Sequence, residues 1–396
     1  MARLIIPSRL VFGAASIAGL YEPVSDIEAA ATLAAAWDAG IRTFDTAPHY
    51  GVGVSERRLG DFLAGRPRDE LVVSTKVGRL LVPATGQAEE GELFVGTPPL
   101  SRVFDFSADG VLRSLEESLG RLRLDRVDVA LIHDPGDHMR QALDEAYPAL
   151  VKLRDQGVAG AIGVGVNSAD LAEWFVRRCD LDCVLVAGRY TLLEQPAAAS
   201  LFPLCLERGV SVLAGGVFNS GILAGGDRYN YVAPPPEIAA KVAWLRRICA
   251  GYDVPLAAVA LRYVLRHPAV TAAVVGARTP AEIEADVDYL SVAIPDDLFR
   301  EIEQRALDAV SSLCGLPSWD SPDDGPAIIS RVSSREIFFA RRNMRKKHDE
   351  CRSSRFRGDR GLRRRAVRNP MPSSRSSAGC GPLTVSAPQP YDREVM

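Results

Sequence analysis

Residues 127–164 read VDVALIHDPGDHMRQALDEAYPALVKLRDQGVAGAIGV, with a short apolar run at each end and a longer segment of helical periodicity between them. The two runs, Val127–Ile132 and Ala161–Val164, have the length and composition of buried strands. Residues 140–156 predict a helix, and Gly157 stands where a C′ glycine would end it. The segment therefore predicts a strand, a crossover helix and a second, parallel strand.

The same alternation repeats along residues 10–290, where eight apolar runs each precede a segment of helical periodicity. The predicted strands are Leu10–Phe12, Ile41–Phe44, Leu71–Thr75, Val127–Ile132, Ala161–Val164, Cys183–Val186, Val210–Leu213 and Thr271–Val275. The predicted helices are 26–39, 55–64, 108–121, 140–156, 169–178, 197–207, 255–266 and 280–290. Helix-end chemistry supports them, because Asp26 and Ser107 stand at N-cap positions and Gly40 at a C′ position.

Eight such units over about 280 residues match the usual size of a (β/α)8 TIM barrel. The alternative is a doubly wound sheet, but no G-x-G-x-x-G follows the first predicted strand. We therefore expect an α/β barrel over residues 1–314.

Three segments interrupt the repeat. Residues 80–106 follow the third predicted strand, residues 216–236 follow the seventh, and residues 237–251 predict an extra amphipathic helix. The first two leave the C-terminal ends of strands, where barrel enzymes build their sites. They are predicted to cover substrate or cofactor, and Phe94, Phe104 and Phe106 are candidates to line the substrate pocket.

Residues 315–396 differ from the rest of the chain in composition. From residue 331 onward there are 17 Lys or Arg against 6 Asp or Glu, and residues 369–390 are dominated by Pro, Ser, Gly and Ala. This composition favours a disordered, solvated tail over a dedicated binding segment for RNA or an acidic partner.

Composition and charge narrow the function classes. The first 330 residues are acidic, which gives no reason to expect nucleic acid binding by the barrel. No uninterrupted apolar run reaches the length of a membrane span and no export signal stands near the N-terminus, so we expect a cytoplasmic protein with no membrane partner. The 7 cysteines lack paired metal-ligand spacing and the histidines lack a ligand pattern, so no metal site is expected.

Four ionisable residues follow the ends of three neighbouring predicted strands: Asp45 and Tyr50 the second, Lys76 the third and His133 the fourth. In a barrel these side chains would meet at one face. A lysine ammonium beside a tyrosine pulls the pKa of the phenol toward neutrality, and Asp45 would hold the lysine charged. His133 could donate to a carbonyl oxygen. The set therefore predicts proton transfer beside an alcohol or carbonyl group.

Two other classes remain open. Lys76 could act as the nucleophile of a Schiff-base aldolase, although a charged lysine argues against this. The chain could also be a non-catalytic subunit that keeps the barrel and a cofactor pocket.

The strings Asp45–Gly51 (DTAPHYG), 74–77 (STKV), 131–134 (LIHD) and 160–167 (GAIGVGVN) resemble the aldo-keto reductase family over residues 4–305. The resemblance implies an oxidoreductase that uses NAD or NADP, acts on a sugar or small aldehyde, and has Asp45, Tyr50, Lys76 and His133 as its catalytic tetrad. Residues 188–193 and 215–218 resemble the aldose 1-dehydrogenase branch, with pyridoxal dehydrogenases nearby.

The resemblance also implies a set of cofactor contacts. These are Asp45, Asn167, Phe218, Asn219, Gly221, Gly276, Arg278 and Glu282. Asn167 corresponds to the carboxamide contact, and Tyr190 is a structural or ring-contacting position. Glu282 would repel a 2′-phosphate and could accept a hydrogen bond from a ribose hydroxyl, which favours NAD over NADP.

Overall fold

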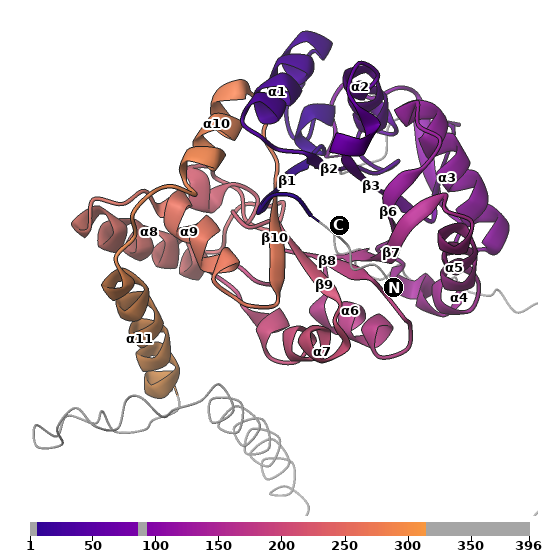
Figure 1. Ribbon diagram of the computed structural model, residues 1–396. Coiled ribbons are helices and arrows are strands. Elements are labelled where there is room, and N and C mark those ends of the chain that lie inside the picture. The colour runs from indigo at the N-terminus through magenta and orange to yellow at the C-terminus, as the bar shows by residue number, and fades with distance from the viewer. Residues whose placement is uncertain (1–5, 86–92, 314–396) are drawn as a thin grey trace, which may run out of the picture. The chain divides into compact units, whose positions relative to one another are not determined.

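A closed barrel of eight parallel strands forms the body of the molecule (Figure 1). The computed structural model describes residues 6–85 and 93–313, so the predicted tail at 315–396 lies outside the described residues. Around the barrel the strand order is β1-β10-β9-β8-β7-β6-β3-β2. The predicted TIM barrel is therefore confirmed.

Each predicted strand has its counterpart in the barrel. The barrel strands are β1 (Leu10–Gly13), β2 (Thr43–Asp45), β3 (Val72–Val77), β6 (Val127–His133), β7 (Ala159–Val166), β8 (Cys183–Ala187), β9 (Ser211–Gly215) and β10 (Val270–Val275). Their side chains alternate between two apolar layers: Val11, Val129 and Leu131 belong to one buried cluster, whereas Phe12 and Ile132 belong to the larger one.

Helices ring the barrel (Figure 1). They are α1 (Asp26–Asp38), α2 (Val54–Leu63), α3 (Ala108–Leu122), α4 (Met139–Gln141), α5 (Tyr147–Asp155), α6 (Ala169–Val176), α7 (Leu201–Arg208), α8 (Pro236–Gly251), α9 (Leu256–Leu265), α10 (Pro280–Asp288) and α11 (Asp296–Leu313). Short 3-10 turns are η1 (Ser16–Ala18), η2 (Arg68–Glu70), η3 (Gly136–His138), η5 (Pro196–Ala198) and η6 (Ile222–Ala224), and η4 (Ala142–Ala146) is a π-helical turn.

The structure corrects several local predictions. The N-cap of α1 is Ser25, not Asp26, because Ser25 is extended and its side chain accepts from the Glu28 N–H while Glu28 bonds back to the Ser25 N–H. The helix predicted at 140–156 is interrupted by the π-helical turn. The helix predicted at 197–207 begins at Leu201, after a separate 3-10 turn. The N-cap at Ser107 is confirmed, since its side chain accepts from the Gly110 N–H.

A pair of strands and a helix lie outside the predicted repeat. Strands β4 (Arg79–Pro83) and β5 (Leu100–Phe104) form an antiparallel pair within the segment that follows β3. Helix α11 follows the eighth unit and lies on the same side of the barrel as α8 and α9 in Figure 1. The extra helix predicted at 237–251 is confirmed as α8.

Among the described residues, no single helix is both long and apolar enough to cross a membrane; α8 and α9 pass that test only as a pair bent by 98°.

Candidate active site

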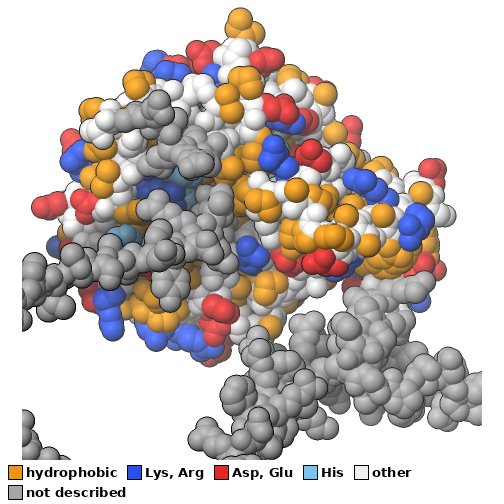
Figure 2. All heavy atoms as spheres, turned by 180° about the vertical axis from the view of Figure 1, so that it is seen from behind, with side chains coloured by type: hydrophobic (Ala, Val, Ile, Leu, Met, Phe, Trp, Pro, Cys, Tyr) orange, Lys and Arg blue, Asp and Glu red, His pale blue; other side chains and the backbone are white. Residues whose placement is uncertain are grey.

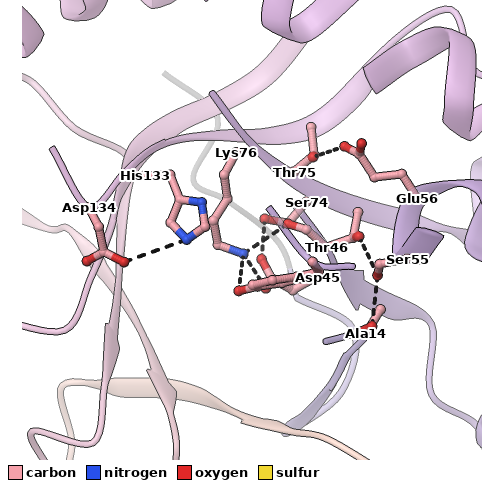
Figure 3. A network of polar contacts seen from close by, with 11 residues as sticks. Ala14, Asp45, Thr46, Ser55, Glu56, Ser74, Thr75, Lys76, His133 and Asp134 are labelled. Atoms are coloured by element: carbon pink, nitrogen blue, oxygen red, sulfur yellow. Dashed lines mark hydrogen bonds and ion pairs between the residues drawn. The ribbon is translucent and has the colours of Figure 1, made fainter. Parts of the chain in front are cut away.

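The four predicted catalytic side chains come together at the C-terminal end of the barrel. Figure 3 shows Asp45, Lys76 and His133 among them. Asp45 ends β2, Tyr50 lies in the loop before α2, Lys76 lies near the end of β3 and His133 ends β6. The parallel register aligns these ends, because Asp45 pairs with Ser74 and Lys76 with Leu131. The arrangement thus follows from the order β2-β3-β6 in the barrel.

Lys76 is the centre of the cluster. Its Nζ lies 2.7 Å from Asp45 Oδ2, 2.9 Å from the Thr46 carbonyl oxygen and 3.0 Å from Tyr50 Oη. These three acceptors use all three ammonium hydrogens. Gly165 of β7 leaves room for the side chain, since a Cβ there would lie 3.3 Å from Lys76 Cε.

The buried pair fixes the charge of the lysine. Lys76 is 1% exposed and Asp45 is 2% exposed. Burial lowers the pKa of Lys76, but the Asp45 carboxylate and Tyr50 more than offset this and raise it to about 12. Lys76 therefore stays an ammonium at neutral pH, which disfavours the Schiff-base aldolase because that chemistry needs a neutral amine.

Tyr50 differs from the prediction made from its neighbours. Burial raises the pKa of Tyr50, and although the Lys76 charge lowers it, the Asp45 carboxylate raises it further. Lys76 therefore lowers the pKa of Tyr50 as expected, but burial and Asp45 outweigh it, and the net shift is upward rather than toward neutrality. The phenol keeps its proton at neutral pH.

Buried hydrogen bonds hold the loop that carries Tyr50. Thr46 Oγ1 and Ser55 Oγ are 2.8 Å apart, and Ser55 Oγ donates to the Ala14 carbonyl oxygen at 2.8 Å (Figure 3). Glu56, which is fully buried at the start of α2, accepts from Thr75 Oγ1 at 2.7 Å. These bonds tie the loop to β1 and β3, which fixes the entry of Tyr50 into the site.

Charged residues that the sequence analysis had not singled out surround His133. Asp134 Oδ2 lies 3.7 Å from His133 Nε2 and 3.8 Å from Nη2 of Arg79, the first residue of β4. On the face seen in Figure 2, His side chains lie close to Lys or Arg side chains. Arg79 could have been suspected from its place three residues after Lys76, but its turn toward β6 depends on the β4–β5 pair.

A cleft lies beside Asp45 and Tyr50, along the C-terminal ends of β1, β8, β9 and β10. Gly13, Gly215, Gly216 and Gly276 line it, so backbone forms part of its surface. At Gly276 a Cβ would lie 2.4 Å from Ser16 Oγ, and at Gly216 it would lie 2.9 Å from the Gly188 nitrogen. Side chains at these glycine positions would narrow the groove. The groove, which has the Asp45 carboxylate and the Tyr50 phenol at one end, fits a dinucleotide.

The predicted cofactor residues fall into two groups. Those that line the cleft are Asp45, Phe218, Gly221, Gly276, Arg278 and Glu282. Asn167 and Asn219 are not among the described residues that line it. The Asn167 side-chain amide donates to Asp134 Oδ2 at 3.3 Å, and Asn219 is 1% exposed.

The aromatic residues singled out in the sequence also differ in position: one lies beside the four predicted catalytic side chains, and the others do not. Phe94 packs with its ring 6.2 Å from Tyr50, next to the tetrad. Phe106 is fully buried in the main core, and its ring, that of Phe104 and that of His138 pack against one another. Tyr190 is also a core residue, since its ring packs against Phe202, Tyr263 and His267.

Comparisons with known proteins agree with this geometry. The family model described as "Aldo/keto reductase family" matches residues 9–306. The chain is 45% identical to a D-threo-aldose 1-dehydrogenase of Pseudomonas sp over 316 residues, which cover 77% of this chain and 96% of that protein. It is 38% identical to a pyridoxal 4-dehydrogenase of Microbacterium luteolum, over 75% of this chain and 94% of that protein.

A solved structure of a dehydrogenase also matches this chain. The glycerol dehydrogenase of Gluconobacter oxydans matches with a TM-score of 0.63 and 25% identity, over 82% of this chain and 100% of that one. The barrel agrees with the fold of this structure. The chain therefore belongs to the aldo/keto reductase family and is an NAD(P)-dependent oxidoreductase.

Proposed function

We propose that the chain is an aldose 1-dehydrogenase, which oxidises the C1 hydroxyl of a cyclic sugar to a lactone. The single observation that carries the proposal is the placement of Lys76 Nζ within 3.0 Å of both Asp45 and Tyr50, at the edge of a cleft that fits a dinucleotide. The choice of an aldose is supported by the 45% identity to a D-threo-aldose 1-dehydrogenase.

In the proposed reaction the C1–H bond breaks with its electron pair, the O–H bond loses its proton, and a C1=O double bond forms. The bound nicotinamide supplies the hydride acceptor. Tyr50 Oη takes the proton from the sugar hydroxyl, and Lys76 stabilises the phenolate that must exist before this transfer. Asp45 keeps Lys76 charged, and His133 donates a hydrogen bond to the sugar oxygen.

The raised pKa of Tyr50 gives a direction to the pH dependence. In oxidation the phenolate is the active form, so the rate should rise with pH across the neutral and mildly alkaline range. In the reduction of an aldehyde the protonated phenol is the active form, so the rate should stay flat over the same range.

A Tyr50→Phe variant tests the role of the phenol. We expect loss of nearly all oxidation of L-fucose, L-galactose and D-arabinose, measured as NADH or NADPH formation at about 340 nm, because phenylalanine has no proton to exchange. Cofactor binding, followed by quenching of protein fluorescence, should be unchanged. A fully active Tyr50→Phe enzyme would exclude this mechanism.

Pyridoxal is the second candidate substrate. The 38% identity to a pyridoxal 4-dehydrogenase favours it, and it carries a hydroxyl that closes on its aldehyde as in a sugar hemiacetal. The kcat/KM ratio for L-fucose against pyridoxal decides between the two. A ratio well below one would replace the aldose with pyridoxal and leave the tetrad chemistry in place.

We further propose a preference for NAD over NADP. In the cleft, Arg278 is held by carboxylates: its Nη1 lies 2.7 Å from Glu22 Oε2 and its Nη2 lies 3.4 Å from Glu282 Oε1. Burial and Glu282 raise the pKa of the neighbouring Asp286 to about 7. An arginine with two carboxylate partners is less available to a 2′-phosphate, and the surrounding acids repel one.

Glu282→Gln tests this preference. The change removes one negative charge and releases part of the hold on Arg278, so the Kd for NADP should fall by about 5- to 10-fold relative to the Kd for NAD. Fluorescence titration with both cofactors measures the ratio. An unchanged ratio in this variant would mean that the acidic group does not set the preference.

A further inference from the structure

Arg79, Asp134 and His133 form a charged cluster on the side of the tetrad away from Asp45. Arg79 is 6% exposed and follows Gly78, whose φ of +98° turns the chain sharply after β3. The Arg79 guanidinium carbon lies 4.9 Å from the centre of the Phe104 ring. An arginine this deeply buried is costly unless a negative group lies near it.

Asp134 is that negative group, and it is shared. Its Oδ2 lies 3.8 Å from Arg79 Nη2 and 3.7 Å from His133 Nε2 (Figure 3 draws the contact with His133). Asn167, at the end of β7, fixes the carboxylate through its backbone N–H at 3.0 Å and its side-chain amide at 3.3 Å. Asp134 therefore stands at a fixed point between a permanent cation and an imidazole.

The His133 ring has few polar contacts besides Asp134. Within the described part of the chain, His133 Nδ1 has no hydrogen-bond partner. The ring packs edge-on against Tyr50, with centroids 5.9 Å apart, and against His49, with centroids 5.7 Å apart. Asp134 is thus the polar group best placed to attract Nε2.

A carboxylate 3.7 Å from an imidazole ordinarily favours the charged imidazolium. Here burial, followed by the charges of Arg79 and Lys76 and by His49, holds the pKa of His133 well below its usual range. The titratable and charged groups facing His133 are His49, Tyr50, Lys76, Arg79 and Asp134. Arg79 and Lys76 both act on each member of the Asp134–His133 pair, and the effect of Arg79 is the larger on each. Lys76 is held by Asp45 and Tyr50, whereas Arg79 lies 3.8 Å from Asp134.

We propose that Arg79 is a positioning residue: by pairing with Asp134 it prevents that carboxylate from drawing a proton onto His133, so that His133 meets the substrate oxygen as a neutral hydrogen-bond donor. The inference rests on the proposed function, in which His133 donates to that oxygen. Without Arg79, His133 would become a charged imidazolium. Its Nε2–H would then donate to Asp134 instead of to the substrate oxygen.

The test is Arg79→Met, which keeps much of the side-chain length but removes the charge. In aldehyde reduction the Tyr50 phenol stays protonated, so the wild-type kcat/KM should be flat between about pH 5.5 and 9. In Arg79→Met the pKa of His133 should rise, so that a new ionisation enters the profile, with kcat/KM falling about 10-fold for each pH unit below it. Arg79→Lys, which keeps a positive charge, should restore the flat profile.

A second substitution separates this effect from a loss of packing. In Arg79→Met/Asp134→Asn the carboxylate is gone as well, so His133 has no anion to pair with and the added ionisation should disappear. Arg154→Met is the control, because Arg154 is a partly buried arginine paired with Asp182 at 2.8 Å, next to the N-terminal end of β8. It should lower stability without changing the shape of the pH profile.

The ionisation of His133 is also measurable without turnover, from imidazole nitrogen NMR shifts of the cofactor-loaded enzyme assigned with a His133→Gln variant. We expect His133 to titrate well below its usual range in the wild type and at least about one pH unit higher in Arg79→Met. Identical titrations in the two proteins would overturn the inference. Failure of the wild type to oxidise any aldose would instead refute the proposed function, and the NMR result would still decide the role of Arg79.

Discussion

Replacing Asp45 by Asn should reveal how strongly the tetrad depends on its buried ion pair. The substitution keeps the shape of the side chain, and its amide can still bond to Ser74, whose Oγ donates to Asp45 Oδ1 at 2.9 Å. It removes the negative charge 2.7 Å from Lys76 Nζ. An ammonium that is 1% exposed then has no counter-charge, and breaking a buried pair in this way costs about 3–5 kcal/mol.

The pH dependence of the free energy of unfolding gives a second estimate of what this ion pair contributes. The pKa of Lys76 rises from its ordinary 10.5 to about 12 in the folded protein. That difference stabilises the fold by about 2 kcal/mol. Because the folded pKa is the higher one, the stabilisation is fully present below pH 10.5 and is lost as the pH rises through about 12.

Urea unfolding of the wild type, Asp45→Asn and Asp45→Asn/Lys76→Met measures both effects. At pH 8 the single variant should be less stable than the wild type by about 3–5 kcal/mol, and the double variant should recover most of the loss because it leaves no buried charge. Between pH 9 and 11.5 the wild type should lose about 1 kcal/mol relative to the double variant. A double variant as unstable as the single one would refute the reasoning, since the cost would then lie in packing.

Two further predictions concern the fold. Ser25→Ala removes the side chain that accepts from the Glu28 N–H at 3.2 Å, so the free energy of unfolding should fall by about 1 kcal/mol; an unchanged midpoint in urea would show that the capping box contributes nothing. Gly163→Ala should cost about 1–3 kcal/mol, because its Cβ would lie 2.1 Å from the Cys183 carbonyl oxygen. Gly120→Ala is its control: nothing lies within 4 Å of that Cβ in the helix α3, so the protein should gain about 0.5–1 kcal/mol, and equal losses in both variants would contradict the steric account.

The barrel was predictable because its signal is local and repeated. Each βα unit, such as β6 with the helical segment before β7, carries its own change from an apolar run to helical periodicity. The strands β4 and β5 carry a different kind of signal: they pair with each other across an intervening segment, and five-residue strands have little periodicity of their own. Helix α11 was not predicted because it follows the eighth unit and belongs to no repeat.

The positions of the tetrad were predictable for the same reason, since parallel strands place their C-terminal ends at one face. The protonation state of Tyr50 was not, because it depends on three opposed effects whose sizes are set in three dimensions. Lys76 at 3.0 Å lowers its pKa, as expected, but burial and the carboxylate that holds Lys76 both raise it. Asp45, which keeps Lys76 charged, therefore also opposes the lowering of the Tyr50 pKa by Lys76. Forming the phenolate needs a further positive charge near Tyr50, and a bound oxidised nicotinamide carries one, so we expect proton removal to be coupled to cofactor binding.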